Sequence, residues 1–142
     1  MKRFALVCGL LLVAASSAAA QDKPFSMVGT WLLKGDGAAI GDSIHPEHKT
    51  GEAEPKVFAA NLRYVIEKQS GTAFWGKSLG QTGTTEPLVG SLTKDAKHGV
   101  TVNARGGTIN FVVVDANTIE GCYVMQTDAQ HFRATCITGT RQ

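Results

Sequence analysis

From about residue 28 onward, short runs of β-branched and aromatic residues alternate with polar positions, and glycine-containing turns separate the runs. Hardly any stretch places apolar residues at the 3.6-residue spacing of an amphipathic helix. This pattern is typical of an all-β sandwich or barrel. The expected strands span 28–34 with an extension through 38–44, 61–69, 72–80, 86–93, 99–104, 108–115, 118–126 and 130–138.

The connections between the expected strands are short and contain residues that favour β-hairpins, such as Ser70-Gly71 and the segments 105–107 and 115–117. Strands joined so closely must be antiparallel neighbours. Closing them into a barrel removes the unpaired edges that an open sheet would expose. We therefore predict an all-β fold, a single antiparallel up-and-down β-barrel of about eight strands. Such a barrel is either filled by its own side chains or holds one small ligand.

The beginning of the chain has the pattern of an export signal. Two basic residues precede an apolar stretch at 4–15, and three alanines at 18–20 provide the small residues that cleavage requires. The apolar stretch is too short for a comfortable membrane anchor. We therefore expect residues 1–20 to be removed and residues 21–142 to form one domain without a membrane span. The expected location is secreted, in a bacterial periplasm.

The charge balance argues against two classes of partner. The formal charge of +2 for the whole chain belongs to Lys2 and Arg3, so the chain is formally neutral after cleavage. A neutral domain has no electrostatic attraction for nucleic acid or for an anionic membrane surface. We expect neither to be a partner.

Cleavage of the signal would remove Cys8 and leave Cys122 and Cys136, an even number in a protein that folds in an oxidising compartment. We predict that they form a disulfide. Closing a loop of this size stabilises the fold by about 3 kcal/mol in the chain-entropy picture. The alternative is a redox or metal-binding pair, but the spacing is unlike CxxC and no histidine lies at ligand spacing.

Successive residues of a strand point to opposite faces, so the charged positions predict the inward ones. Trp75 has the parity of Lys77 and should point outward, where an exposed indole indicates a partner surface, a subunit contact or a bulge. The expected inward side is mainly apolar: Trp31, Leu33, Leu62, Tyr64, Ile66, Phe74, Leu88, Gly90, Leu92, Val100, Val102, Ile109, Phe111 and Val113.

The last hairpin contains a conflict. Bonded cysteines opposite each other must share a face, which places either Glu120 inside or Phe132 outside unless a bulge intervenes. Glu120 inside the barrel would be a weak candidate for acid–base catalysis. A bulge or a position in water is the alternative. No other internal acid is expected.

The segment 41–56 interrupts the rhythm of the strands, and we expect a long loop there. It would be either a lid at the barrel mouth or a solvated excursion. His45 and His48, with Glu47 between them, are weak candidates for a metal site. Two solvated histidines are the alternative, and we expect no cofactor.

Gly29-Thr30-Trp31 resembles the Gly-x-Trp start of the first strand in lipocalins and avidins, and avidins in particular read Gly-Thr-Trp. The resemblance implies a calycin-type barrel in which Trp31 plugs one end and its indole N–H reaches a backbone acceptor. The biotin contacts of avidins are not matched, because Leu33 and Gly37 stand at two of their polar positions. The resemblance therefore implies the fold and, more loosely, ligand binding.

Sequence signatures of catalysis are missing: the G-x-S-x-G string at residues 76–80 lies within an expected strand and not at the strand-to-helix turn of a nucleophile elbow, and the chain contains no phosphate loop or dinucleotide fingerprint. We therefore expect a binding protein of lipocalin/avidin-like type for a small apolar or aromatic molecule. One alternative is a self-filled barrel that interacts with another protein or forms a homo-oligomer through Trp75. Another is a small barrel enzyme such as an isomerase or cyclase. The expected ligand-binding residues are Trp31, Tyr64, Phe74, Phe111 and Tyr123.

Overall fold

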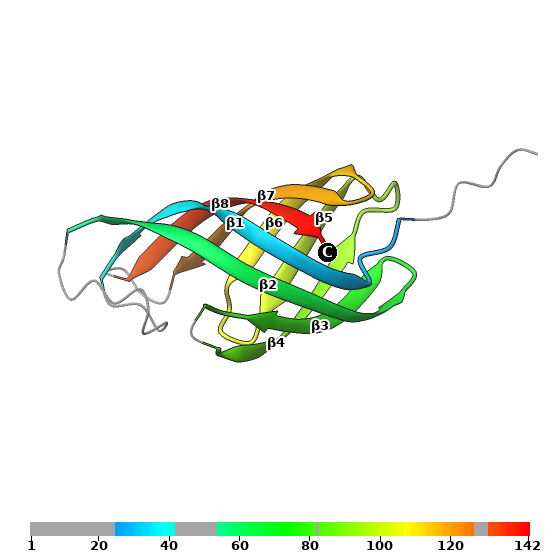
Figure 1. Cartoon of the computed structure of the whole chain (residues 1–142), viewed down its shortest axis with the longest axis horizontal. Coiled ribbons are helices and arrows are strands. Elements are labelled where there is room, and N and C mark those ends of the chain that lie inside the picture. The colour runs from blue at the N-terminus through cyan, green and yellow to red at the C-terminus, as the bar shows by residue number, and fades with distance from the viewer. Residues whose placement is uncertain (1–24, 42–53, 82, 127–130) are drawn as a thin grey trace, which may run out of the picture.

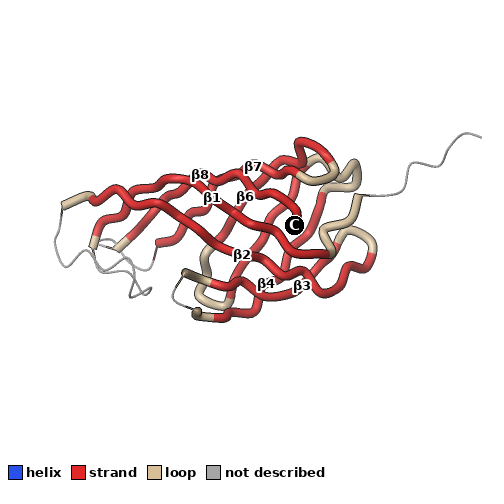
Figure 2. Tube along the Cα trace, viewed as in Figure 1, coloured by secondary structure: helices blue, strands red, loops and turns tan. Residues whose placement is uncertain are grey.

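The computed structural model describes residues 25–41, 54–81, 83–126 and 131–142. They form a closed barrel of eight antiparallel strands, in which each strand pairs with the next and the last returns to the first (Figure 1). The described residues contain strands and loops without a helix (Figure 2), so the predicted fold class is confirmed. The strands are β1 (Gly29–Ile40), β2 (Lys56–Ser70), β3 (Ala73–Leu79), β4 (Thr85–Leu92), β5 (His98–Asn103), β6 (Thr108–Asp115), β7 (Thr118–Gln126) and β8 (Phe132–Arg141).

The strand bounds follow the predicted ones closely, apart from β2, which begins at Lys56 instead of residue 61. Its first residues pair with the end of β1, where Gly37 faces Phe58 and Ala38 faces Val57. Small residues have little strand propensity of their own, and here the pairing decides their conformation. The predicted export signal and the histidines His45 and His48 lie outside the described residues, as does most of the predicted loop.

The barrel has two different ends. The closed end contains residues 25–28, which lead into β1, and the last residues of β8. The short turns after β2, β4 and β6 lie at the same end. At the far end, β1 stops at Ile40 and β2 begins at Lys56. Figure 1 shows β1, β2 and β8 extending past β3 and β4 at the far end. Within the described part of the chain, no helix is long and apolar enough to cross a membrane.

Trp31 seals the closed end. Its side chain is 0 % exposed, and its indole Nε1–H donates a hydrogen bond to the backbone oxygen of Met27 at 2.8 Å. Met27 is itself fully buried, and the Phe25 ring lies 6.4 Å from the Trp31 ring between centroids. The role that the Gly-Thr-Trp resemblance implied for this residue is therefore confirmed by the geometry.

Arg141, near the end of β8, covers the outer side of the Trp31 indole. Its guanidinium carbon lies 4.3 Å from the indole centroid, a distance that favours a cation–π interaction. The guanidinium donates to the backbone oxygens of Ala116 at 3.1 Å and Val28 at 2.5 Å, and also to that of Ser26. One side chain thus ties the start of β1, the β6–β7 turn and the end of β8 together.

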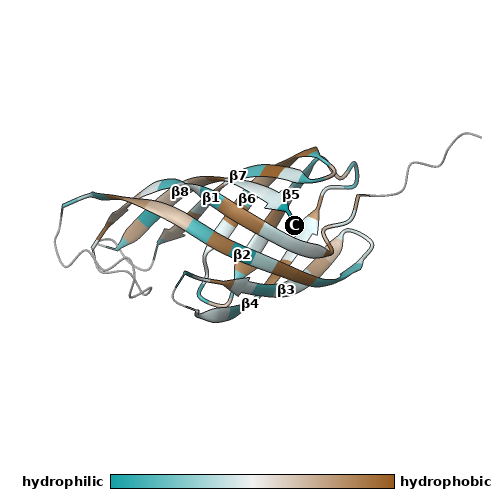
Figure 3. Ribbon diagram, viewed as in Figure 1, coloured by the Kyte–Doolittle hydropathy of each residue, from teal (hydrophilic) through white to brown (hydrophobic). Residues whose placement is uncertain are grey.

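The predicted alternation is confirmed on most strands, and apolar and polar positions alternate visibly along the ribbon (Figure 3). The prediction for β5 is wrong: Val102 is 40 % exposed and Val100 points to the same side. Register places Gly99 and Thr101 inward, opposite the inward positions of β4. Gly99 is needed there, because a Cβ at this residue would lie 2.3 Å from the Phe111 ring. The ring fills the space that a valine side chain would require.

The disulfide between Cys122 and Cys136 is present, with an S–S distance of 2.01 Å. The two cysteines face each other across β7 and β8 on the exposed outer face. Phe132 is 43 % exposed and Glu120 is also exposed, so the conflict in this hairpin is resolved with Phe132 outside. Glu120 therefore lacks the internal position on which its candidacy as a catalytic acid depended.

Trp75 points outward as predicted and is 40 % exposed. It pairs with Val89 of β4, and Val89 pairs with Val102 of β5. Directly opposed residues share a face and lie next to each other. We call these three residues the outer apolar row. The pairing continues around the barrel through further residues, most of them apolar: Thr108, Val124, Ala134, Ala38 and Val57.

Candidate functional site

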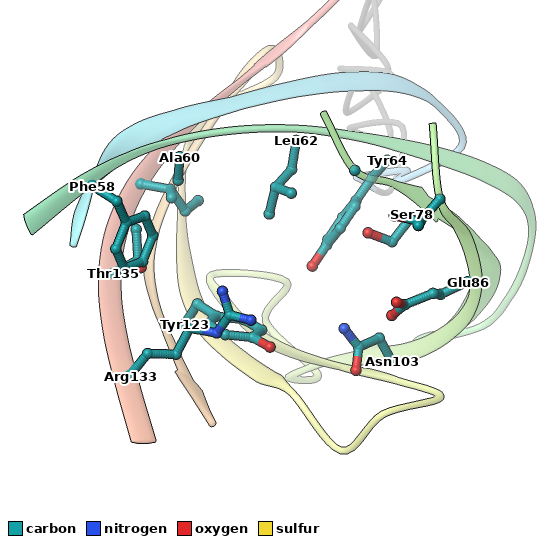
Figure 4. Close-up of a pocket in the computed structure, with 13 residues that line it drawn as sticks. Phe58, Ala60, Leu62, Tyr64, Ser78, Glu86, Asn103, Tyr123, Arg133 and Thr135 are labelled. Carbon is teal, nitrogen blue, oxygen red and sulfur yellow. The ribbon is translucent and has the colours of Figure 1, made fainter. Parts of the chain in front are cut away.

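A cavity lies inside the barrel toward its far end (Figure 4). The space open to water is about 40 Å³, room for about three water molecules at ~10–15 Å³ each. This volume is also close to that of one small functional group. Its lining comes from six strands, β2, β3, β4, β5, β7 and β8, and from the turn between β3 and β4: Phe58, Ala60, Leu62, Tyr64, Ser78, Gly80, Thr84, Glu86, Asn103, Tyr123, Arg133, Thr135 and Ile137.

One wall of the cavity is apolar. Phe58, Ala60 and Leu62 are alternate residues of β2 and all reach the cavity, as the pleat of a strand requires. Ile137 of β8 lines the same space. This wall offers a surface to which a ring or a short hydrocarbon segment could pack.

Arg133 brings a positive charge to the cavity wall. It is only 7 % exposed, and its guanidinium carbon lies 6.0 Å from the Phe58 ring centroid and 5.6 Å from that of Tyr123. Its inward direction follows from the register, since it pairs with Met125 and Ala39, which are both buried. The two rings hold the plane of the guanidinium by cation–π contacts.

Glu86 supplies a carboxylate on another wall and is also 7 % exposed. Arg105, in the turn between β5 and β6, forms an ion pair with it at 2.8 Å between Nε and Oε1. Figure 4 shows Glu86 beside Asn103, across the cavity from Arg133. The negative charge of the carboxylate is therefore offset locally by Arg105.

Two phenol groups face the cavity. Burial raises the pKa of Tyr64 to about 12, while a hydrogen bond with Thr101 acts in the opposite direction. Burial also raises the pKa of Tyr123, against the lowering influence of the neighbouring Arg133. Both hydroxyls therefore keep their protons at neutral pH and can donate hydrogen bonds. The Tyr123 hydroxyl donates to the Met125 sulfur at 3.2 Å.

Asn103 is oriented by the turn that follows β5. Its side-chain oxygen accepts hydrogen bonds from the backbone N–H groups of Arg105 at 3.1 Å and Gly107 at 2.9 Å. The amide nitrogen consequently points toward the cavity (Figure 4). Gly107 makes room for the site, because a Cβ there would lie 2.1 Å from the Tyr123 hydroxyl oxygen.

The structure separates the five residues predicted to bind a ligand into two groups. Tyr64 and Tyr123 line the cavity. Trp31, Phe74 and Phe111 belong to the packed core, with the two phenylalanine rings 6.5 Å apart between centroids. The role of all five in ligand binding stays a prediction, and only the two tyrosines stand where a molecule in this cavity would meet them.

Sequence reasoning missed the charged residues of the cavity, Arg133 and Glu86. A signal for both was present, because Arg133 has the parity of Ile137 and Glu86 that of Leu88, and these two apolar partners point inward. Among the residues that the structure describes, no group of three or more His, Cys, Asp and Glu side chains is placed to hold a metal ion.

Comparisons with known proteins leave the family open. The chain matches no known protein-family description, and no curated protein sequence matches it. Among solved structures, the chain is similar to the S-type phycobiliprotein lyase CPES from Guillardia theta, with a TM-score of 0.38 and 13% sequence identity over 82% of this chain and 88% of that one. A likeness of this degree carries no functional conclusion for this chain.

Proposed function

We propose that this protein binds a small molecule with an apolar or aromatic part in the cavity at the far end of the barrel. The observation that carries this proposal is the uneven distribution of inward side chains. The closed end is filled by Trp31 and Met27, whereas Arg133, Glu86 and Tyr123 surround a cavity toward the other end. An eight-stranded barrel has an interior of the size that holds one small ligand.

The energetics of burial support a binding role for this end. Burying an arginine or a glutamate costs free energy unless other groups compensate, and apolar residues of similar volume often fill such positions at no loss of stability. A barrel that only had to fill itself would gain from apolar residues at positions 86 and 133. Glu86 is offset by Arg105, and the charge of Arg133 is explained if a bound molecule uses it.

We further propose that the protein is secreted and works in an oxidising compartment such as a bacterial periplasm, as a binding protein of lipocalin/avidin-like type. The pattern of residues 1–20 supports export. The bonded pair Cys122–Cys136 is compatible with an oxidising compartment.

The test is native mass spectrometry of the protein isolated from the periplasm of its host, before and after denaturation. We expect an organic molecule that accompanies the folded chain and leaves on unfolding. Ala60→Leu, which extends a cavity-lining side chain, should abolish the added mass. Ala59→Leu is the matched control, because Ala59 is the exposed neighbour. A ligand retained equally by both variants, or none in the unmodified protein, would count against the proposal.

The outer apolar row favours a second candidate function, self-association of two copies. Trp75, Val89 and Val102 lie side by side on three neighbouring strands, and in a two-fold dimer Val89 would lie near the axis while Trp75 met Val102 of the partner. Sedimentation equilibrium tests this: Val89→Lys should convert a dimer to a monomer, and Val112→Lys, at an exposed residue outside the row, should not. A monomeric unmodified protein would exclude this candidate.

A further inference from the structure

Hydrogen-bond donors predominate around the cavity. Arg133 carries five N–H groups in a planar fork, and the amide nitrogen of Asn103 faces the same space (Figure 4). Both side chains also form a hydrogen bond with the Tyr123 hydroxyl. The phenol of Tyr64 keeps its proton, since its pKa is about 12. The carboxylate acceptor, Glu86, is engaged by Arg105 at 2.8 Å. A ligand group that accepts hydrogen bonds and carries negative charge suits these surroundings.

We propose that the cavity receives the carboxylate of a small aromatic or apolar acid and that Arg133 is the residue that binds it. This inference rests on the function proposed above and specifies the chemistry of its ligand. A guanidinium and a carboxylate are both planar, and they can form two parallel hydrogen bonds with high geometric selectivity. Such charge-assisted bonds are roughly twice as strong as neutral ones.

The packing of Arg133 suits this role. Phe58 and Tyr123 lie 6.0 Å and 5.6 Å from its guanidinium carbon, so aromatic contacts restrain the fork before a ligand arrives. A restrained side chain loses less conformational freedom on binding. The Phe58 ring belongs both to this restraint and to the apolar wall, so the ring of an aromatic acid would pack beside the group that holds its carboxylate.

The volume of the cavity sets the manner of entry. A space of about 40 Å³ accommodates a carboxylate but not a whole aromatic ring, which needs a void of roughly 150 Å³ in a packed interior. The cavity therefore takes the acid group beside Arg133, and the apolar part packs against the adjoining apolar wall, to which Phe58 belongs. An uncharged acid isostere would gain the apolar contact alone.

Glu86 provides the competing chemistry, because a carboxylate on the wall would attract a cationic ligand. Three probes of similar size separate the cases: benzoate, neutral benzamide and cationic benzylammonium. We would titrate each into the folded, disulfide-bonded protein and follow the backbone amide signals by two-dimensional NMR. We expect benzoate to bind at least tenfold more tightly than benzamide, and benzylammonium to bind most weakly.

The variants assign the preference to one residue. Arg133→Gln should reduce the affinity for benzoate to that for benzamide, and Arg133→Lys, which keeps the charge without the fork, should lie between. Arg63→Gln is the matched control, because Arg63 is exposed on β2, and it should leave all three affinities unchanged. Thermal unfolding of each variant shows whether it is folded. If Arg133→Gln is not folded, the benzoate affinity of Arg133→Lys tests the role of Arg133.

The outcomes distinguish this inference from the function on which it rests. Equal binding of benzoate and benzamide, tighter binding of benzylammonium, or a preference for benzoate that survives in the Arg133 variants would overturn the role of Arg133. The proposed binding function would stand in each of these cases. If none of the probes binds and the isolated protein carries no organic molecule, both proposals fail together.

Discussion

Two arginines on the last strand, eight residues apart, show how differently the two ends of the barrel are built. Arg141 lies 4.3 Å from the Trp31 ring centroid, and its guanidinium donates to three backbone oxygens, two before β1 and one in the β6–β7 turn. Arg133 also lies near aromatic rings, those of Phe58 and Tyr123, but it lines a cavity. Both arginines have aromatic neighbours, but the guanidinium of Arg141 is held by backbone oxygens, whereas that of Arg133 borders a cavity.

The comparison shows that an arginine beside aromatic rings can have either a structural role or a role in binding. At the closed end, backbone carbonyls of Ser26 and Val28 take up the donors of Arg141, so the residue acts as a structural brace. At the far end, the Arg133 guanidinium borders a space that another molecule can enter (Figure 4). The closed end should therefore determine stability, and the far end should determine binding.

The largest expected effect is at the closed end. Trp31→Ala should lower the free energy of unfolding by about 3–5 kcal/mol, because it empties a fully packed position. Trp75→Ala is the matched control on the outer face and should cost less than about 1 kcal/mol. Denaturant unfolding followed by circular dichroism measures both. Equal losses would show that Trp31 does not hold this end closed.

The disulfide is expected to stabilise the barrel without affecting binding in the cavity. The double variant Cys122→Ser, Cys136→Ser should lose about 3 kcal/mol of unfolding free energy, since the bonded residues are 14 positions apart in the chain. The affinity for benzoate should stay within twofold of the unmodified value. Adding a reductant to the double variant is the control and should change nothing further. A large loss of affinity would mean that the cavity depends on this cross-link.

A direct exchange of the two arginines for glutamine sharpens the comparison. Arg141→Gln should lower the unfolding free energy by about 2 kcal/mol, since it leaves backbone carbonyls without their donors and removes a cation–π contact. Arg133→Gln should cost less, about 1 kcal/mol, which is the size of the cation–π contacts with Phe58 and Tyr123 that it removes. Urea unfolding midpoints give both values. If Arg133→Gln proved the more destabilising of the two, the division of roles would be refuted.

The smallest expected effect is a dependence of stability on alkaline pH. Tyr64 has a pKa of about 12 in the folded protein against the ordinary value of 10.0, so the unfolded chain loses this proton first. The contribution of this group to stability is complete below pH 10 and is lost as the pH rises toward 12. The loss of unfolding free energy is about 1.4 kcal/mol at pH 11. Between pH 9 and 11, the unfolding free energy of the unmodified protein should therefore fall by about 1.4 kcal/mol relative to that of Tyr64→Phe. If the two plots of unfolding free energy against pH were parallel, the Tyr64 phenol would have an ordinary pKa and would be exposed to water.

Much of the fold could be predicted from the sequence, because turn residues and alternation mark the strands independently of tertiary contacts. The inward directions of Trp31, Tyr64 and Ile66 followed from the charged residues on the same strands. The failure on β5 has a physical cause: Val100 and Val102 are the apolar residues of that strand, yet Gly99 has to face inward beneath the Phe111 ring. Such a fit between neighbouring strands is invisible in the pattern of one strand.

The site could be predicted only in part. Tyr64 and Tyr123 were expected near a ligand because aromatic side chains suit binding cavities, and the cavity does include them. Arg133 and Glu86 were missed because charged residues were assigned to the solvent side even where their parity with Ile137 and Leu88 indicated an inward direction. Register would have been required to bring these residues from different strands to one end of the barrel.

The positions of the two chain ends have a practical consequence. The backbone N–H of Gln142 donates to the backbone oxygen of Thr30 at 2.9 Å, so the carboxyl terminus lies beside the start of β1 (Figure 1). Residue 25, where the described chain begins, packs against Trp31 at the same end. A tag, linker or fused domain attached at the carboxyl terminus would therefore emerge opposite the cavity, and a barrel immobilised in this way would present its binding end to the solution.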